Sequence, residues 1–438
     1  MKIRKLEPCE FARAIRNGLG SAFLHIHEYG DDGLEDELAY ACTNNLVYER
    51  QSDNWRHTWL SRMLTNTGRI DLYAEKIRET FESLPEDQAD LHQLVWLAVE
   101  LYELGFDSFR QILLDLIEQA ANSFDCDAAI FPALINVAGL KGLSISAKWL
   151  VKMHPDDAYA MLDLFDHACD VLDEWAVSAY FEKHTATDDS LKTFTESVEA
   201  EKLKKDLPSE PYQSPVPPTL SEVIELVKSA KDFKHIRGLM QFGKRASASE
   251  IDEIYRRLER ERDPFKQNAY LECFRVQPLP RVTNELLPML DSDHDRVRFH
   301  AISSISRSKS QLVRELALSR IATENERDIS TGIGLLRANY EPADAASIHS
   351  AMVKIKNPDL IDAVVRVMLD IAEQHPGKIL TESWLWLFEF GPCGSCRSSI
   401  LKQLVKHNVA PAQLLLEARW DANFEVRGIA RGTPCDNQ

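Results

Sequence analysis

Two closely spaced cysteines are the residues of this chain whose types and spacing best suit chemistry. Cys393 and Cys396 form a Cys-x-x-Cys pair. Such a pair at the start of a helix can lower the pKa of its first thiol or hold a metal. No second cysteine pair completes a four-cysteine zinc site, and no alternation of strands and helices surrounds this one. The sequence favours two small buried side chains here, with a redox or thiol site as the alternative.

Other patterns for chemistry are incomplete. His25 and His27 would share a face only on a strand, and their segment has a helical pattern. The acidic loop that begins at Asp291 has the opening spacing of an EF-hand, but Arg296 stands where the loop needs glycine. The chain has no P-loop, no Gly-x-Ser-x-Gly and no His-Glu-x-x-His. We therefore predict no catalytic residues, no metal site and no cofactor.

The second half of the chain repeats a two-helix pattern about every 32 residues. Residues 284–318 combine an apolar helix, a turn rich in aspartate and a second helix that opens with Val-Arg-x-x-Ala, and residues 414–430 repeat this order. A turn aspartate can cap the second helix. A hairpin of this kind cannot bury its apolar stripe alone, so neighbours must stack. The corresponding positions, 30 to 36 residues apart, are Phe233, Phe265, Val297, Ile329, Leu360, Cys396 and Val426.

This pattern resembles the HEAT repeats of the armadillo-like α-solenoids over residues 220–431. The resemblance implies an all-α, right-handed α-α superhelix. It also implies that the turn aspartate and the following arginine are structural ladders between repeats. In this chain those residues are Asp291 or Asp293 with Arg298, and Asp421 with Arg427.

In HEAT-like solenoids the second helix of each hairpin lines the concave surface. The expected second helices contain 17 Lys and Arg but only 6 Asp and Glu. We therefore predict a basic concave track that could hold an acidic protein segment, a nucleic-acid backbone or the chain's own first half. HEAT-type DNA glycosylases use Trp and a catalytic Asp over such a track, and these helices carry no Trp. The track residues are Arg237, Lys244, Arg245, Arg307, Lys309, Lys402 and Lys406.

Charge and proline divide the chain into three parts. Residues 1–219 have a net charge of −19 and residues 220–438 a net charge of +1. Five prolines lie within 201–219, where a helix cannot continue. We predict an acidic helical domain at 1–200, which could be an irregular continuation of the solenoid, then a linker at 201–219 and a HEAT-like domain at 220–438. In the first part, aspartates spaced by three or four residues from Asp163 to Asp173 predict a solvated helix face, or a docking stripe for a basic partner.

The composition limits the class of protein. Of 438 residues, 44% are hydrophobic and 27% are charged, which supports a packed core. The absence of any Asn-Gly pair disfavours a many-stranded protein. No apolar run approaches the roughly 18 residues of a membrane span, and the start of the chain lacks the apolar core of a secretory signal. Eight scattered cysteines fit reduced thiols, so we predict a cytoplasmic protein with no membrane partner.

These observations predict a function only by class. The leading hypothesis is a non-enzymatic protein-binding scaffold or regulatory subunit with an extended helical surface and an unknown protein partner. A toxin-neutralising or defence-associated accessory protein is one form of it, because the acidic surface suits a basic partner. The alternative is a nucleic-acid-binding solenoid that could process DNA bases. The net charge of −18 disfavours this alternative.

Overall fold

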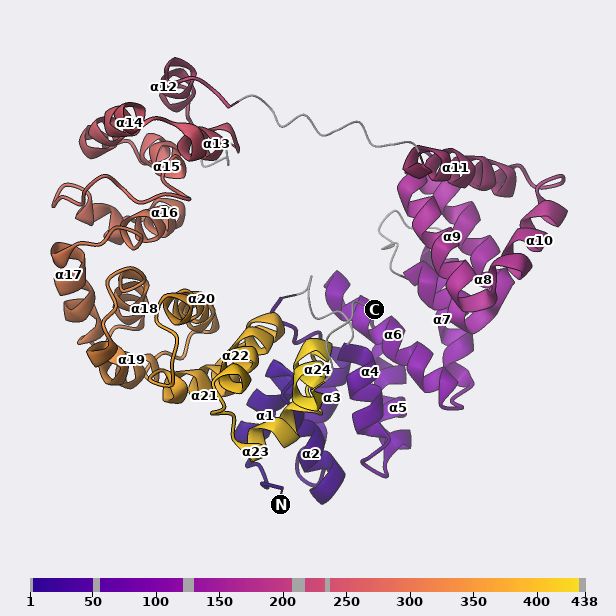
Figure 1. The fold of residues 1–438 in the computed structure, drawn as a ribbon. Coiled ribbons are helices and arrows are strands. Elements are labelled where there is room, and N and C mark those ends of the chain that lie inside the picture. The colour runs from indigo at the N-terminus through magenta and orange to yellow at the C-terminus, as the bar shows by residue number, and fades with distance from the viewer. Residues whose placement is uncertain (1–2, 50–55, 121–129, 207–216, 233–236, 433–438) are drawn as a thin grey trace. The chain divides into compact units, whose positions relative to one another are not determined.

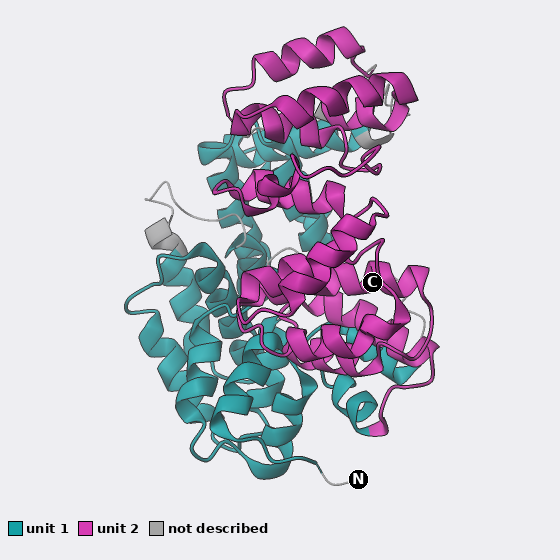
Figure 2. Ribbon diagram, turned by 90° about the vertical axis from the view of Figure 1, so that its left-hand side faces the viewer, with its two compact units in different colours: residues 1–212, 413–438 teal, residues 213–412 magenta. Residues whose placement is uncertain are grey.

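The computed structural model describes residues 3–49, 56–120, 130–206, 217–232 and 237–432. Within these ranges every regular element is helical, with 24 α-helices and two short 3-10 helices (Figure 1). The predicted all-α class is therefore confirmed. The chain divides into two compact units, of which unit 1 comprises 1–212 with 413–438 and unit 2 comprises 213–412 (Figure 2).

Unit 1 contains the first eleven helices and the end of the chain. Asp87, Asp157 and Asp173 each cap the start of a helix in this unit. Asp87, for example, accepts the backbone N–H groups of Ala89 and Asp90. The helices are α1 (Pro8–Asn17), α2 (Gly20–Tyr29), α3 (Glu35–Thr43), α4 (Arg56–Leu64), α5 (Ile70–Thr80), α6 (Gln88–Glu103), α7 (Ser108–Ala120), α8 (Ile130–Met153), α9 (Ala158–Leu172), α10 (Glu174–His184), α11 (Asp189–Asp206), α23 (Ala412–Ala418) and α24 (Phe424–Arg431).

Among the described helices, only α8 has a length and composition that would allow it to cross a bilayer, and 56% of its most apolar window is buried inside the structure. Its backbone leaves the helical region at Gly139, with φ 57° and ψ −136°. A Cβ on Gly142 would lie 2.3 Å from the carbonyl oxygen of Leu134. The element is therefore two shorter segments joined at a sharp bend, and it packs against α9 and α11.

The end of the chain packs against its beginning inside unit 1. The Trp420 ring stacks on Phe23 with centroids 4.8 Å apart. The indole N–H of Trp59 donates to the backbone oxygen of Trp420 at 2.8 Å. A Cβ on Gly20 would lie 1.8 Å from the carbonyl oxygen of Glu417, so α2 and α23 approach to a distance that only glycine permits. Helix α23 and the turn that follows it therefore pack against α2 and α4 inside unit 1.

Unit 2 contains the remaining helices, most of them short and joined by tight turns. They are α12 (Leu220–Lys228), α13 (Arg237–Arg245), α14 (Ala248–Arg260), α15 (Pro264–Glu272), the 3-10 helix Leu287–Asp291, α16 (Asp295–Ile305), α17 (Gln311–Ile321), α18 (Glu326–Leu335), the 3-10 helix Pro342–Asp344, α19 (Ala345–Met352), α20 (Pro358–Gln374), α21 (Thr381–Phe390) and α22 (Gly394–Lys406).

Each predicted hairpin of unit 2 contributes one helix to an ordered row. We call α13, α15, α16, α18, α20 and α22 the second helices, and each of them contacts the next. In Figure 1 the members α16, α18 and α20 of this row lie inward of α17 and α19, which follow the outer side of the unit. Val297, Ile329 and Val365 are fully buried along the row, so neighbouring hairpins share one core.

The repeat positions found in the sequence lie at the starts of these helices. Asp263 caps α15, as expected for a turn aspartate, but Asn325, Asn357 and Asn423 cap α18, α20 and α24. The predicted aspartate cap is therefore found at α15, whereas asparagine takes its place at α18, α20 and α24. Phe265, Val297, Ile329, Leu360, Cys396 and Val426 all fall within the first four residues of a helix, and Phe233 lies outside the described residues.

The arginines of the Val-Arg-x-x-Ala openings are structural. Arg298 donates to the backbone carbonyl of Ser292, and Arg427 donates to that of Asp421 at 2.8 Å. Each side chain thus holds the turn that precedes its own helix, six residues earlier in the chain.

Asp291 joins neighbouring hairpins through a different arginine from the one expected. It pairs with Arg320 of α17 at 2.6 Å, and Arg320 also reaches Asp328 of α18 at 3.1 Å. Arg298 pairs instead with Asp295 in its own helix. The inter-repeat ladder therefore runs through Arg320, which lies outside the Val-Arg-x-x-Ala motif.

The boundaries of the units differ from the predicted domains on both sides of unit 2. Helix α11 continues to Asp206, so 201–206 of the predicted linker are helical, and 207–216 lie outside the described residues. Unit 2 closes at Ala412. The residues that follow belong to unit 1, where Trp420 contacts Phe23 of α2 and Trp59 of α4.

Candidate functional site

The Cys-x-x-Cys pair lies beside a buried carboxylate of the preceding second helix. Cys393 is the N-cap of α22, and its sulfur accepts the backbone N–H of Cys396 at 3.4 Å. The Cys396 thiol donates to Oδ1 of Asp362 in α20 at 3.5 Å. The two sulfurs and the carboxylate oxygen all lie within 4.8 Å of one another. We call Asp362, Cys393 and Cys396 the dithiol-carboxylate cluster.

The surroundings of the cluster control its protonation. The pKa of Cys396 is raised by its hydrogen bond with Cys393, by burial and by the negative charge of Asp362. Nε of Arg366, one turn along α20, donates to Oδ2 of Asp362 at 3.1 Å, and the other carboxylate oxygen, Oδ1, faces the Cys396 thiol. Asp362 and Cys393 are buried, whereas Cys396 is half-buried, so the cluster borders solvent.

The sequence analysis recognised the two cysteines but not their acidic neighbour. Asp362 is separated from them by the whole of α21, and only the contact between α20 and α22 brings the three groups together. No spacing rule in the sequence connects such residues. The expectation that both cysteines are small buried side chains holds for Cys393, which is 7% exposed, while Cys396 is more accessible.

The predicted track residues lie at or just beyond the C-terminal ends of second helices. Lys244 and Arg245 end α13, Lys309 follows α16, and Lys402 and Lys406 occupy the second half of α22; all five are exposed. The side chain of Arg237 lies outside the described residues, although its backbone begins α13.

Arg307 belongs to a set of three arginines at matching places in consecutive hairpins. Arg275, Arg307 and Arg337 follow the ends of α15, α16 and α18 and are spaced by 32 and 30 residues. We call them the arginine column. Sequence reasoning singled out Arg307 alone, but the spacing, which matches the repeat, was the signal that could have identified the other two.

The members of the arginine column act on one another electrostatically. The pKa of Arg307 is lowered by burial and then by the positive charges of Arg337 and Arg275. Arg337 pairs with Asp370 at 2.5 Å, and Arg275 lies 3.8 Å from Glu272. Arg307 donates to the backbone and hydroxyl oxygens of Ser303, and it forms no ion pair with a carboxylate in the described part of the chain. The middle of the column therefore has no direct ion pair among the described residues, and the negative charge of Asp370 opposes the lowering of the Arg307 pKa only in part.

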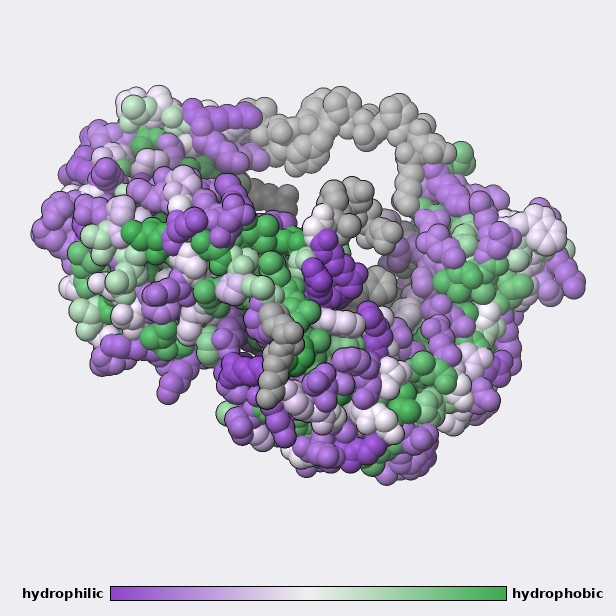
Figure 3. All heavy atoms as spheres, turned by 60° about the horizontal axis from the view of Figure 1, so that its bottom comes forward, coloured by the Kyte–Doolittle hydropathy of each residue, from purple (hydrophilic) through white to green (hydrophobic). Residues whose placement is uncertain are grey.

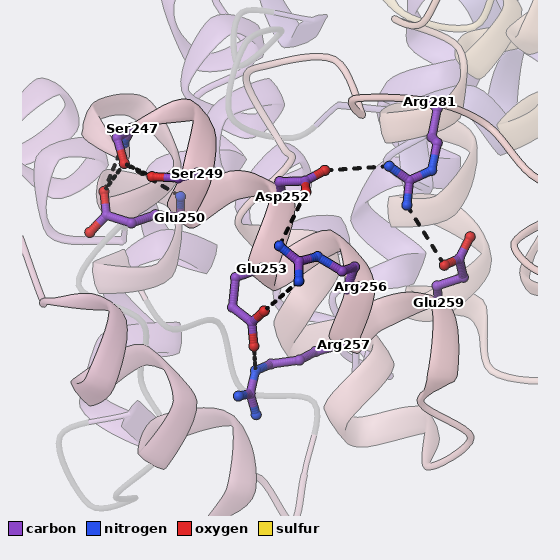
Figure 4. Close-up of polar contacts among 9 residues, drawn as sticks. All are labelled: Ser247, Ser249, Glu250, Asp252, Glu253, Arg256, Arg257, Glu259 and Arg281. Carbon is purple, nitrogen blue, oxygen red and sulfur yellow. Dashed lines mark hydrogen bonds and ion pairs between the residues drawn. The ribbon is translucent and has the colours of Figure 1, made fainter.

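A second arginine-rich surface, on α14, is neutralised locally (Figure 4). Asp252 pairs with Arg256 and with Arg281, each at 3.3 Å, and Glu253 pairs with Arg257 at 2.8 Å. Because these acids match the arginines of the same surface, an anionic ligand would have to displace them. The adjoining cavity has a volume of about 370 Å³ and is lined by Glu253, Arg256, Arg257, Arg260, Glu261 and Tyr270.

The histidine pair of α2 separates as expected for a helix. His25 is buried, and its Nδ1 accepts the backbone N–H of Leu6 at 2.9 Å. His27 is exposed, with Nδ1 2.8 Å from Oδ1 of Asn66. Burial, followed by the charge of Lys5, lowers the pKa of His25.

The aspartates of α9 form the solvated face predicted from their spacing. Asp163, Asp166 and Asp170 are exposed, and Asp173 ends the helix with φ 76° and caps α10. On the face of the molecule drawn in Figure 3, hydrophilic side chains predominate and hydrophobic ones lie between them.

Comparison with protein-family models, with curated proteins and with solved structures found no match to this chain.

Proposed function

We propose that unit 2 is a right-handed HEAT-like solenoid and that the protein is a non-enzymatic scaffold or regulatory subunit whose second helices bind an acidic protein segment. The observation that carries this proposal is the arginine column, which repeats with the hairpins and whose central member has no ion-pair partner among the described residues. The ordered contacts of the second helices support the solenoid.

The spacing of the column favours an extended chain with regularly placed carboxylates. Packed helices lie about 8–10 Å apart. A peptide in the extended polyproline II conformation advances about 3.1 Å per residue with three residues per turn, so every third side chain lies on the same face. One carboxylate in every third residue would therefore meet successive arginines. Arginine suits this role because its planar fork binds a carboxylate through two parallel hydrogen bonds.

A protein ligand fits the chain better than nucleic acid does. The net charge of −18 repels a polyanion at long range, whereas a short acidic segment carries far fewer charges. The described second helices also offer few exposed aromatic rings for base stacking. Phe299 of α16 is a large aromatic side chain on these helices that is exposed, with 58% of its surface accessible.

The test uses the full chain and a labelled peptide with glutamate at every third position among serine and glycine. We expect saturable binding that weakens at least tenfold in the double variant Arg307→Gln/Lys309→Gln and falls with added salt. The matched control is Arg327→Gln/Lys356→Gln, which removes two exposed charges at the opposite, N-terminal ends of α18 and α20. This control should bind the peptide like the wild type.

A second measurement separates the two classes of ligand. Partners captured from the source cell should be released by the glutamate peptide and lost in the Arg307→Gln/Lys309→Gln variant. Nanomolar binding of duplex or single-stranded DNA at physiological salt, lost in the same variant, would overturn the proposal in favour of a nucleic-acid-binding protein. Equal peptide binding by both double variants would reject the arginine column as the binding surface.

A further inference from the structure

The hairpin that contains α22 carries cysteine at two positions where the corresponding helices α15, α16, α18, α20 and α24 carry other residues. Where Asn325, Asn357 and Asn423 cap their helices, Cys393 caps α22. A thiol is a much weaker hydrogen-bond acceptor than an amide oxygen and is not among the favoured caps. One turn later, Cys396 occupies the position that fully buried valines hold in α16 and α24. Neither cysteine is thus the residue that the repeat would select for stability.

Both cysteines face the same carboxylate. Asp362 is 3% exposed, and the Cys396 thiol lies 3.5 Å from its Oδ1. With Zn–S bonds of about 2.3 Å and a Zn–O bond of about 2.1 Å, a tetrahedral ion would hold two sulfurs about 3.8 Å apart and a sulfur and an oxygen about 3.6 Å apart. The cluster, whose three ligand atoms lie within 4.8 Å of one another, needs only small side-chain rotations to meet these values.

The charges of the cluster suit a divalent cation. Two thiolates and one carboxylate carry three negative charges, which the half-buried site cannot hold without compensation. A Zn²⁺ ion together with the guanidinium of Arg366 supplies three positive charges. Arg366 holds Oδ2 of Asp362 and so fixes the carboxylate with Oδ1 toward the sulfurs, which is the orienting role that outer partners have in metal sites.

We propose that Asp362, Cys393 and Cys396 bind one zinc ion, with the fourth position open to solvent beside Cys396. Zinc fits the mixed ligand set because it accepts both thiolate and carboxylate ligands in a tetrahedron. The ion links α20 to α22 and replaces the stability that an amide cap and a valine would give this hairpin. Binding releases the two thiol protons to solvent. This proposal is independent of the arginine column.

The experiment titrates the full chain, reduced and freed of metal by chelation, with Co²⁺ as a spectroscopic substitute for Zn²⁺. We expect one Co²⁺ per chain, a near-ultraviolet sulfur-to-metal charge-transfer band, visible bands of tetrahedral intensity, and displacement by Zn²⁺. Cys396→Ser should abolish most of the charge-transfer band. Asp362→Asn, which keeps the volume of the side chain, should keep the band and weaken binding at least tenfold.

Controls separate this site from adventitious binding and from loss of folding. Cys9→Ser and Cys169→Ser remove thiols outside the cluster and should bind like the wild type. Zn²⁺ should raise the unfolding temperature of the wild type but not that of Cys396→Ser. If Cys396→Ser unfolds, the Asp362→Asn titration decides alone. Binding that is unchanged in both variants, or no binding at all, overturns the proposal. So does a Cys393–Cys396 disulfide, found by mass spectrometry, that persists in the presence of Zn²⁺.

Discussion

Gly20 lies at a contact between helices where a side chain has no space. Its missing Cβ would overlap the Glu417 carbonyl oxygen at 1.8 Å and approach the backbone nitrogen of Asp421 at 2.8 Å. Both neighbours are backbone atoms, which cannot rotate away. Glycine carries a hydrogen atom where alanine carries a methyl group, and only the hydrogen atom leaves room for α23 to contact α2.

Gly20→Ala should therefore destabilise unit 1 by about 1–3 kcal/mol or more, the usual cost of overpacking. Chemical denaturation followed by tryptophan fluorescence measures it. Gly238→Ala is the control, because the new methyl group would meet only a Pro218 carbon at an ordinary 3.4 Å. That change should be neutral or slightly stabilising. Equal stability of both variants would contradict the close approach.

His25 makes the start of the chain sensitive to acid. Because its folded pKa lies below the ordinary value of 6.5, the unfolded state binds the proton more readily. The stability of the region should thus be constant above about pH 6.5 and fall as the pH decreases below it. The hydrogen-exchange protection factors of α1 and α2, which correct for the intrinsic pH dependence of amide exchange, should fall as the pH decreases from about 6.5 to 5.5. His25→Gln should reduce this loss of protection, and His27→Gln, at an exposed position, should not.

At the starts of α18 and α20 in unit 2, asparagine rather than the turn aspartate caps the helix. Asn357 accepts the backbone N–H groups of Asp359 and Leu360 at 2.9 and 3.4 Å. Those two groups would otherwise have no partner within the helix. The element therefore begins where the side chain can reach back to the first turn.

Asn357→Ala should reduce the stability of unit 2 by about 1 kcal/mol, whereas Asn357→Asp should be nearly neutral because its carboxylate can accept the same hydrogen bonds. Urea denaturation of the three proteins measures the difference. Because Asn357 is exposed, neither change disturbs packing. A loss of equal size in both variants would indicate that the cap does not account for the effect.

At the scale of the whole molecule, the chain passes between its two units twice. It leaves unit 1 before residue 213 and returns at Gln413. The segment 413–438 thus belongs by sequence to the second half and by packing to the first. The chain connects the two units at two places, near residue 213 and near residue 413. Cutting one of these connections therefore leaves the units joined by the other.

A protease site inserted within 207–216 tests this arrangement. After cleavage, the two fragments should still co-elute in size-exclusion chromatography, because Trp420, in the turn between α23 and α24, stays in contact with Phe23 of α2 and Trp59 of α4. Trp420→Ala should weaken the association of the cleaved fragments, since it removes the stack on Phe23. The loss should be smaller than the roughly 3–5 kcal/mol of a fully buried large-to-small change, because Trp420 is half-buried. Phe424→Ala, at a side chain that is 48% exposed, is the control. Separation of the wild-type fragments immediately after cleavage would contradict the division into units.

The sequence by itself determined the helical class, the starts of the repeated helices and the exposed aspartate face of α9. Each of these depends on local periodicity and turn chemistry, which lie within a few consecutive residues. The repeat positions, for example, all fall in the first turns of helices wherever the structure describes them. The same local reasoning separated His25 from His27 on α2.

Only the tertiary structure decided which distant residues meet. Asp362 reaches Cys396, Arg320 rather than Arg298 pairs with Asp291, and Trp420 returns to Phe23. In each pair the partners are separated in sequence by at least one intervening turn or helix. Their approach depends on how side chains of different helices fill shared space, and hydrophobic burial, which drives that packing, has no direction along the chain. A periodic pattern therefore predicts an element, but it does not specify which residue of another element it contacts.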